Sequence, residues 1–122
     1  GQCNDMPAAY MLADVVVSAS IEPEAFGRIV AEAQAMGRPI IATDHGGAKE
    51  CVIPGETGWL VPPNDADALA EAIRRALALS PDVRRALAAR AVAHIAANFS
   101  KEAMCAKTLA VYDEVMAAPF SR

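Results

Sequence analysis

Two short apolar runs, separated by a helical pattern, constrain the fold of this chain more than any other feature. They are Val15-Val16-Val17-Ser18 and Pro39-Ile40-Ile41-Ala42-Thr43. Compact runs of this kind are typical of strands that a parallel sheet buries on both faces. A strand, a helix and a second strand in this order predict parallel pairing through a right-handed crossover. The helix between them is expected over residues 27–36, with Gly37 as its C-cap and a buried face of Ile29, Val30, Ala33 and Met36.

A third strand, Trp59-Leu60-Val61, and several helices are expected around this unit, which makes the fold class α/β. Trp59 and Tyr112 are interpreted as packing residues. The last helix carries an apolar stripe of Met104, Leu109 and Tyr112. Further helices should end near Leu12 and Val52, and others should begin at Asn64 or Asp65, at Ser80 and at Ser100.

The composition argues against several classes of protein. A length of 122 residues fits one domain. The net charge of −4, without a cluster of Lys and Arg, argues against nucleic-acid binding. No apolar run reaches the roughly 18 residues of a membrane span, so a soluble cytoplasmic protein is expected. The three cysteines, Cys3, Cys51 and Cys105, lie far apart in the sequence. This spacing indicates reduced thiols rather than a metal site.

Three strands are few for a parallel sheet, whose central strands have neighbours on both sides. We therefore expect further strands upstream of Gly1, and the missing initial methionine suggests a fragment, a processed product or an absent leader. Without such strands, Val15-Ser18 would present an unpaired edge that invites association with another copy of the chain.

The residues best suited to a polar ligand gather between Glu24 and Glu50. Two glycine turns, Phe26-Gly27 and Gly46-Gly47, each lead into a helical pattern. Both could direct unpaired backbone N–H groups and a positive helix end at one anion. Two acidic residues, Glu24 and Glu32, accompany the first turn with seven residues between them.

Several motifs in this chain follow one another in a distinctive order. They are Glu24-x-Phe26-Gly27 with Glu32, Gly37-x-Pro39, Ala42-Thr43, Gly46-Gly47-x-x-Glu50, Gly55-x-Thr57-Gly58-x-Leu60-Val61 and Asp65-x-x-Ala68-Leu69-Ala70. From Gly1 to about Tyr112 the series resembles the C-terminal part of a retaining glycosyltransferase of family 4, a GT-B group that uses nucleotide-diphosphate sugars. The resemblance implies a partial Rossmann-like three-layer unit, with helices on both faces of a short parallel sheet. Residues 1–122 would then form part of a nucleotide-sugar-binding domain, without its upstream strands or the acceptor domain.

The resemblance also implies roles for single residues. Glu32 is similar to the second glutamate of the family motif, which accepts hydrogen bonds from the ribose hydroxyls. Glu24 resembles the first glutamate, close to the donor sugar and the reacting centre, and is the catalytic candidate. The backbone groups expected near the sugar and diphosphate belong to Ala25, Phe26, Gly27, Gly46 and Gly47.

The implied activity is the transfer of a hexosyl group to an acceptor hydroxyl with retained configuration. The nucleotide-diphosphate sugar is a substrate, and neither a metal nor a further cofactor is implied. The acceptor is unknown, with a lipid-linked or polysaccharide acceptor as candidates. The Arg and Lys that clamp the diphosphate in this family belong to an earlier segment, and no residue here matches them. The chain by itself is therefore predicted to be inactive.

Other interpretations of these residues stay open. Arg28 and Glu32 could form a surface ion pair, Glu24 could be an exposed loop acid and Gly46-Gly47 an ordinary loop. His45 is more often a solvated loop residue, although a ligand contact is possible there. The chain could also be a non-catalytic nucleotide-binding or association module. A GT-B epimerase or phosphorylase would share the fold but fits the motif series less well.

Overall fold

A fully buried strand, β2 (Ile40–Thr43), lies at the centre of the sheet in the computed structural model, which describes residues 3–118. It pairs in parallel with β1 (Val16–Ser18) on one side and with β3 (Trp59–Val61) on the other. Parallel pairing requires a crossover between consecutive strands, and helices supply both crossovers. The predicted α/β fold with a short parallel sheet is confirmed.

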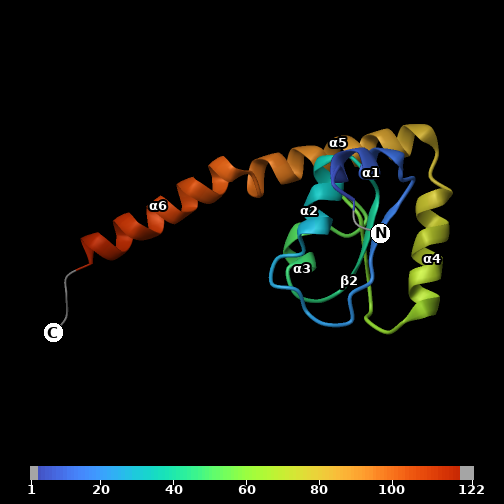
Figure 1. Cartoon of the computed structure of the whole chain (residues 1–122), viewed down its shortest axis with the longest axis horizontal. Coiled ribbons are helices and arrows are strands. Elements are labelled where there is room, and N and C mark those ends of the chain that lie inside the picture. The colour runs from blue at the N-terminus through green and yellow to red at the C-terminus, as the bar shows by residue number, and fades with distance from the viewer. Residues whose placement is uncertain (1–2, 119–122) are drawn as a thin grey trace.

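Alternate residues of β2 face two separate apolar clusters. Ile40 and Ala42 pack into a cluster with α2 (Arg28–Ala35) and α3 (Ala48–Cys51). Ile41 packs with Val61 of β3 against Ala72 and Ala76 of α4 (Ala66–Leu77). Figure 1 shows α2 and α3 on one side of the strands and α4 on the other. The helices therefore cover both faces, as a strand buried on both sides requires.

Two further helices complete the cluster around α2. The short α1 (Met6–Leu12) contributes Tyr10, its one buried residue. The long α5 (Pro81–Asn98) packs along α2 and contributes Ile95. These contacts hold α1 and α5 on the same side of the sheet.

The predicted helix starts agree with the structure. Asp65, rather than Asn64, caps α4 by accepting a hydrogen bond from the N–H group of Ala68 at 2.8 Å. Asp5, Ser80 and Ser100 cap the helices that follow them in the same way. Each cap satisfies a backbone donor that has no partner within its helix.

Two predictions about buried faces are wrong. Ile29 is exposed, and the buried face of α2 instead includes Gln34. In the core, Nε2 of Gln34 donates to the backbone carbonyls of Val30 and Cys51, while its Oε1 has no partner among the described residues. In β1, Val17 is 38% exposed, because β2 is the one strand that pairs with β1 among the described residues.

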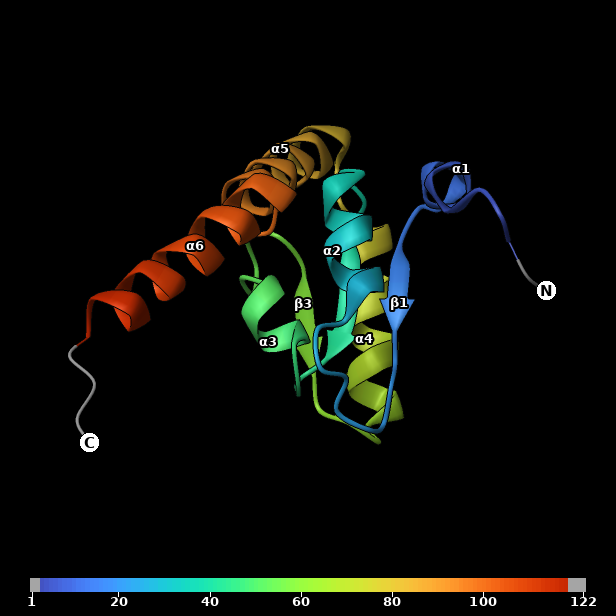
Figure 2. The same cartoon turned by 60° about the vertical axis from the view of Figure 1, so that its left-hand side comes forward.

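The last helix, α6 (Lys101–Ala117), extends away from the sheet and its layers (Figures 1 and 2). It has no buried residue, so the expected apolar stripe of Met104, Leu109 and Tyr112 lies in solvent. The prediction that Tyr112 packs is therefore wrong, with 62% of this residue exposed. The other predicted packing residue, Trp59, does pack against the cluster under α4. None of the described helices is long and apolar enough to cross a bilayer.

The turn before β3 generates a stability prediction. Thr57 is 1% exposed, and its hydroxyl oxygen accepts a hydrogen bond from the N–H group of Ile53 at 2.9 Å. We expect Thr57→Val, which keeps the shape but removes the acceptor, to lower the free energy of unfolding by about 1–3 kcal/mol. Thr57→Ser keeps the acceptor and loses one methyl group, so it should cost less than the Val variant. Urea unfolding of both variants checks this, and a Val variant as stable as the Ser variant would contradict it.

Candidate functional site

The candidate site lies where β1 and β2 end. Both strands run in the same direction, so Ser18 and Thr43 bring the loops that follow them to one edge of the sheet. In open parallel sheets, ligands bind outside this carboxyl edge. A small hollow at this edge is lined by the ends of the two strands, the loops that follow them and the first turns of α2 and α3. The lining residues are Ser18, Ser20, Glu24, Gly27, Val30, Thr43, His45 and Ala48.

The two glycine turns predicted to face one anion are in direct contact with each other. The N–H group of Gly47 donates to the carbonyl oxygen of Glu24 at 2.9 Å. A side chain on Gly46 would collide with the backbone of Glu24, and one on Gly47 with the backbone of Phe26. Gly46 also has a φ of +53°, in the left-handed region that favours glycine. Both glycines therefore let the backbone of the second turn approach that of residues 24–26. The contact supports the loop that carries Glu24.

The start of α2 is well suited to an anion. Gly27 is its N-cap with a φ of +72°, and no side chain caps this end of the helix. The N–H group of Val30 donates to the carbonyl of Gly27, whereas those of Arg28 and Ile29 have no backbone partner in the described part of the chain and can meet a ligand. The positive end of the helix dipole adds to the attraction.

A threonine and a histidine tie the β1–α2 loop to the end of β2. The hydroxyl of Thr43 donates to the carbonyl oxygen of Ser20 at 2.7 Å, and Nε2 of His45 lies 2.7 Å from the same oxygen. The ring must therefore donate through Nε2, while its buried Nδ1 has no partner among the described residues. His45 is thus a half-buried loop anchor rather than a solvated residue. The sequence carries no signal for this role, because Ser20 is 25 residues away.

The structure separates the two glutamates. Glu24 lies at the start of α2, with Oε2 3.9 Å from where a Cβ of Gly27 would stand, and it lines the hollow. Glu32 lies further along α2 and faces α1 instead. There it lines a second, more open cavity of about 430 Å³ with Asn4, Met6, Pro7, Tyr10, Arg28, Ala35 and Met36.

The carboxylate of Glu32 is held at both oxygens. The hydroxyl of Tyr10 donates to Oε2 at 2.9 Å, and Nη2 of Arg28 pairs with Oε1 at 3.1 Å. The ion pair weighed from the sequence is therefore present, although Arg28 is largely in solvent. Burial, followed by the hydrogen bond to Glu32, raises the pKa of Tyr10 to about 12. Sequence reasoning missed Tyr10, because it and Glu32 belong to different helices.

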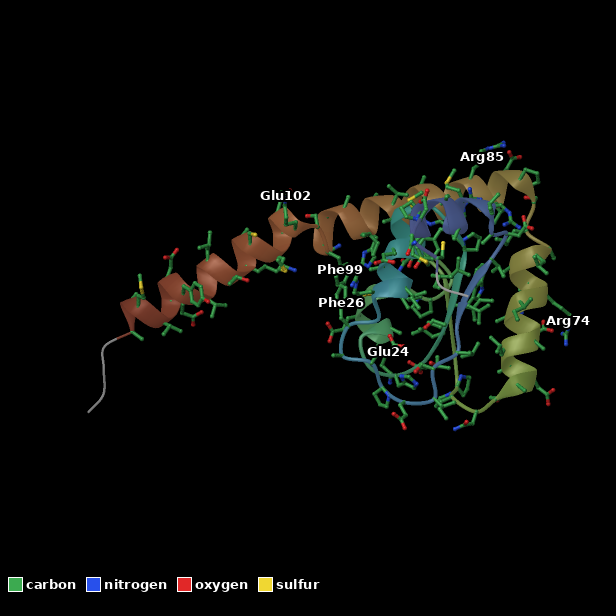
Figure 3. The ribbon with its side chains drawn as sticks, viewed as in Figure 1. Glu24, Phe26, Arg74, Arg85, Phe99 and Glu102 are labelled. Atoms are coloured by element: carbon green, nitrogen blue, oxygen red, sulfur yellow. The ribbon has the colours of Figure 1, made fainter. Side chains whose placement is uncertain are left out.

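Aromatic packing anchors the loop between β1 and α2, which carries Glu24 and Phe26, to the C-terminal end of α5. The rings of Phe26 and Phe99 lie 6.0 Å apart (Figure 3). The ring of His94 meets that of Phe99 edge-on, with the ring centres 5.6 Å apart. His94 therefore has a packing role at the end of α5. Phe26 itself stays partly exposed, so the loop is anchored to the end of α5 without being buried.

Several arginines outside the candidate site form ion pairs on the surface of α4 and α5. Arg74 and Arg75 pair with Glu71 along α4, and Arg85 pairs with Asp82 on α5. Within residues 3–118, no group of three or more His, Cys, Asp or Glu side chains could hold a metal ion.

Comparisons with known proteins agree with this geometry. Residues 1–93 match the family model "Glycosyl transferases group 1". The D-inositol 3-phosphate glycosyltransferase of Salinispora tropica is 39% identical over 115 residues, which are 93% of this chain and 23% of that protein. The protein of the same name from Saccharomonospora viridis is 40% identical over 114 residues, 93% of this chain and 26% of that protein. The chain thus spans about a quarter of these relatives.

Solved structures show the same likeness. A glycosyltransferase from Rickettsia africae superposes with a TM-score of 0.90 at 39% identity, over 98% of this chain and 32% of that one. The Anabaena protein HepE, in complex with UDP-glucose, gives a TM-score of 0.80 at 31% identity, over 91% of this chain and 31% of that one. By its sequence and its fold, this chain belongs to the group 1 glycosyltransferases, and it matches part of the length of larger proteins with the GT-B fold.

Proposed function

We propose that this chain carries the donor-binding half-site of a glycosyltransferase that uses a nucleotide-diphosphate sugar. The observation that carries the proposal is the position of Glu24 over the uncapped start of α2. A carboxylate and a set of backbone donors then meet at the carboxyl edge of a parallel sheet. The complex of HepE with UDP-glucose supports this class of donor.

The donor would extend along α2. Its diphosphate would meet the N–H groups at the start of the helix, and its ribose hydroxyls would donate to Glu32. Glu32 lies five positions after Gly27, a helical rise of about 7.5 Å, which a nucleoside diphosphate can span. The cavity between α1 and α2, with apolar walls from Met6, Pro7 and Met36, would receive the base.

The reaction proposed for the full-length protein is hexosyl transfer to an acceptor hydroxyl with retained configuration and without a metal. As the diphosphate leaves, its charge grows, and donors fixed in advance stabilise that charge best. The start of α2 would supply some of these donors, with Glu24 next to the sugar. The cationic clamp and the acceptor site would come from other parts of the polypeptide.

The first test is nucleotide binding. We expect UDP to shift the amide resonances of Gly27 and Glu32 in the full chain, and Glu32→Gln to weaken UDP binding about tenfold by removing a charged acceptor. Glu102→Gln, on the exposed face of α6, is the matched control and should leave affinity unchanged. Equal affinity of the two variants, or no binding of UDP, GDP or ADP at millimolar concentration, would overturn the proposed site.

A second test concerns turnover. Incubated with UDP-glucose, the 122-residue chain should release nucleotide no faster than UDP-glucose hydrolyses in buffer alone. The reason is that no residue of this sequence matches the Arg and Lys expected to stabilise the leaving diphosphate. Release can be followed by ion-exchange chromatography of the nucleotide. A rate above that of buffer, lost in Glu24→Gln, would show that the chain is active alone.

The second candidate function is a non-catalytic nucleotide-binding or association module. It is favoured by the partly exposed strand β1, which pairs on one side with β2 and has no second neighbouring strand within residues 3–118, so that another strand can pair there. We expect a concentration-dependent mass in light scattering, and Val17→Lys, which puts a charge on this edge, should restore the monomer. A strictly monomeric mass at millimolar concentration would contradict association through β1.

A further inference from the structure

The strongest unassigned feature is the buried phenol that meets the carboxylate of Glu32. Tyr10 is 5% exposed, and its hydroxyl donates to Oε2 at 2.9 Å from the opposite wall of the cavity. We infer that Tyr10 is a positioning residue, whose hydroxyl holds Glu32 in the orientation that accepts the two ribose hydroxyls of a nucleoside diphosphate. This inference rests on the proposed function and names a residue that acts through Glu32.

Packing accounts for the ring of Tyr10 but not for its hydroxyl. Tyr10 is the one buried residue of α1, and its ring belongs to the cluster of Val30, Ala33 and Ile40. A phenylalanine would supply the same apolar contact and would need no hydrogen-bond partner at its tip. Because the ring is fixed in the core, the position of the hydroxyl is fixed as well, and Glu32 meets a rigid donor.

The hydrogen bonds to Glu32 leave room for a ribose. An ionised carboxylate accepts about four hydrogen bonds, two at each oxygen. Tyr10 takes one at Oε2, and Arg28 takes one at Oε1. One site then remains on each oxygen, which matches the two neighbouring hydroxyls of a ribose.

Of the two groups that bond to the carboxylate of Glu32, Tyr10 fixes its orientation more firmly than Arg28 does. The side chain of Arg28 is 84% exposed, and a surface ion pair of this kind contributes little and weakens with salt. Tyr10 stays protonated throughout the physiological range, since the pKa of its hydroxyl is raised to about 12. Without Tyr10, the 37% exposed side chain of Glu32 would be free to change rotamer, and binding would have to order it.

The experiment compares Tyr10→Phe with Tyr112→Phe in the full chain. Tyr112 lies on the exposed α6, and no hydrogen bond of its hydroxyl is present in the described part of the chain, so its variant is the matched control. The probes are UDP, GDP and ADP, and the one that binds wild type most tightly is compared with its 2′,3′-dideoxy analogue. Titrations followed by amide shifts give the affinities, and urea unfolding gives the stabilities.

We expect Tyr10→Phe to weaken binding of the ribose nucleotide about tenfold, as for one hydrogen bond to a charged group, and Tyr112→Phe to leave it unchanged. Binding of the dideoxy analogue should be the same in wild type and Tyr10→Phe, because it has no hydroxyls for Glu32 to accept. In a Glu32→Gln background, Tyr10→Phe should have little further effect.

Three results would overturn the inference. They are an unchanged or raised affinity in Tyr10→Phe, an equal loss for the ribose and dideoxy nucleotides, and an undiminished effect in the Glu32→Gln background. The second would show that Tyr10 shapes the cavity rather than acting through Glu32. If Glu32→Gln weakens binding while Tyr10→Phe does not, only this inference fails. If no nucleoside diphosphate binds wild type, the proposed function fails, and this inference with it.

Discussion

The burial of β2 on both faces is the constraint on which the rest of this structure depends. Ile40 and Ala42 point to one helical layer and Ile41 to the other, so a strand of four residues holds both layers in place. Its parallel neighbours end at the same edge as β2 does. The loops after β1 and β2 must therefore meet there, and this meeting creates the hollow beside Glu24.

At that edge, hydrogen bonds to two backbone carbonyls position the loop between β1 and α2. The bond from Gly47 to Glu24, and the two bonds to the carbonyl of Ser20, fix the loop that leads into α2. A loop fixed in this way holds its N–H groups in place before a ligand arrives, which lowers the cost of ordering them on binding. The glycines contribute by being small, since a side chain at Gly46 or Gly47 would push the two loops apart.

The sides of α2 have different roles. One side packs on the sheet, while another carries Glu32 toward α1, where the ring of Tyr10 is part of the core and its hydroxyl reaches the cavity. α6 differs from the other long helices, because none of its residues is buried among the described ones.

The sequence by itself determined the order of strands and helices, the parallel sheet, the helix caps and the motif series that identifies the family. These follow from local chemistry, as at the Ser80 cap, or from compact apolar runs such as residues 40–43. The tertiary structure alone decided which side chains meet. The approach of Tyr10 to Glu32, the anchoring of Ser20 by His45, the burial of Gln34 and the exposure of Ile29 and Tyr112 all depend on neighbours distant in the chain. Local spacing carries no information about such neighbours, because the packing of whole layers sets their distances and angles.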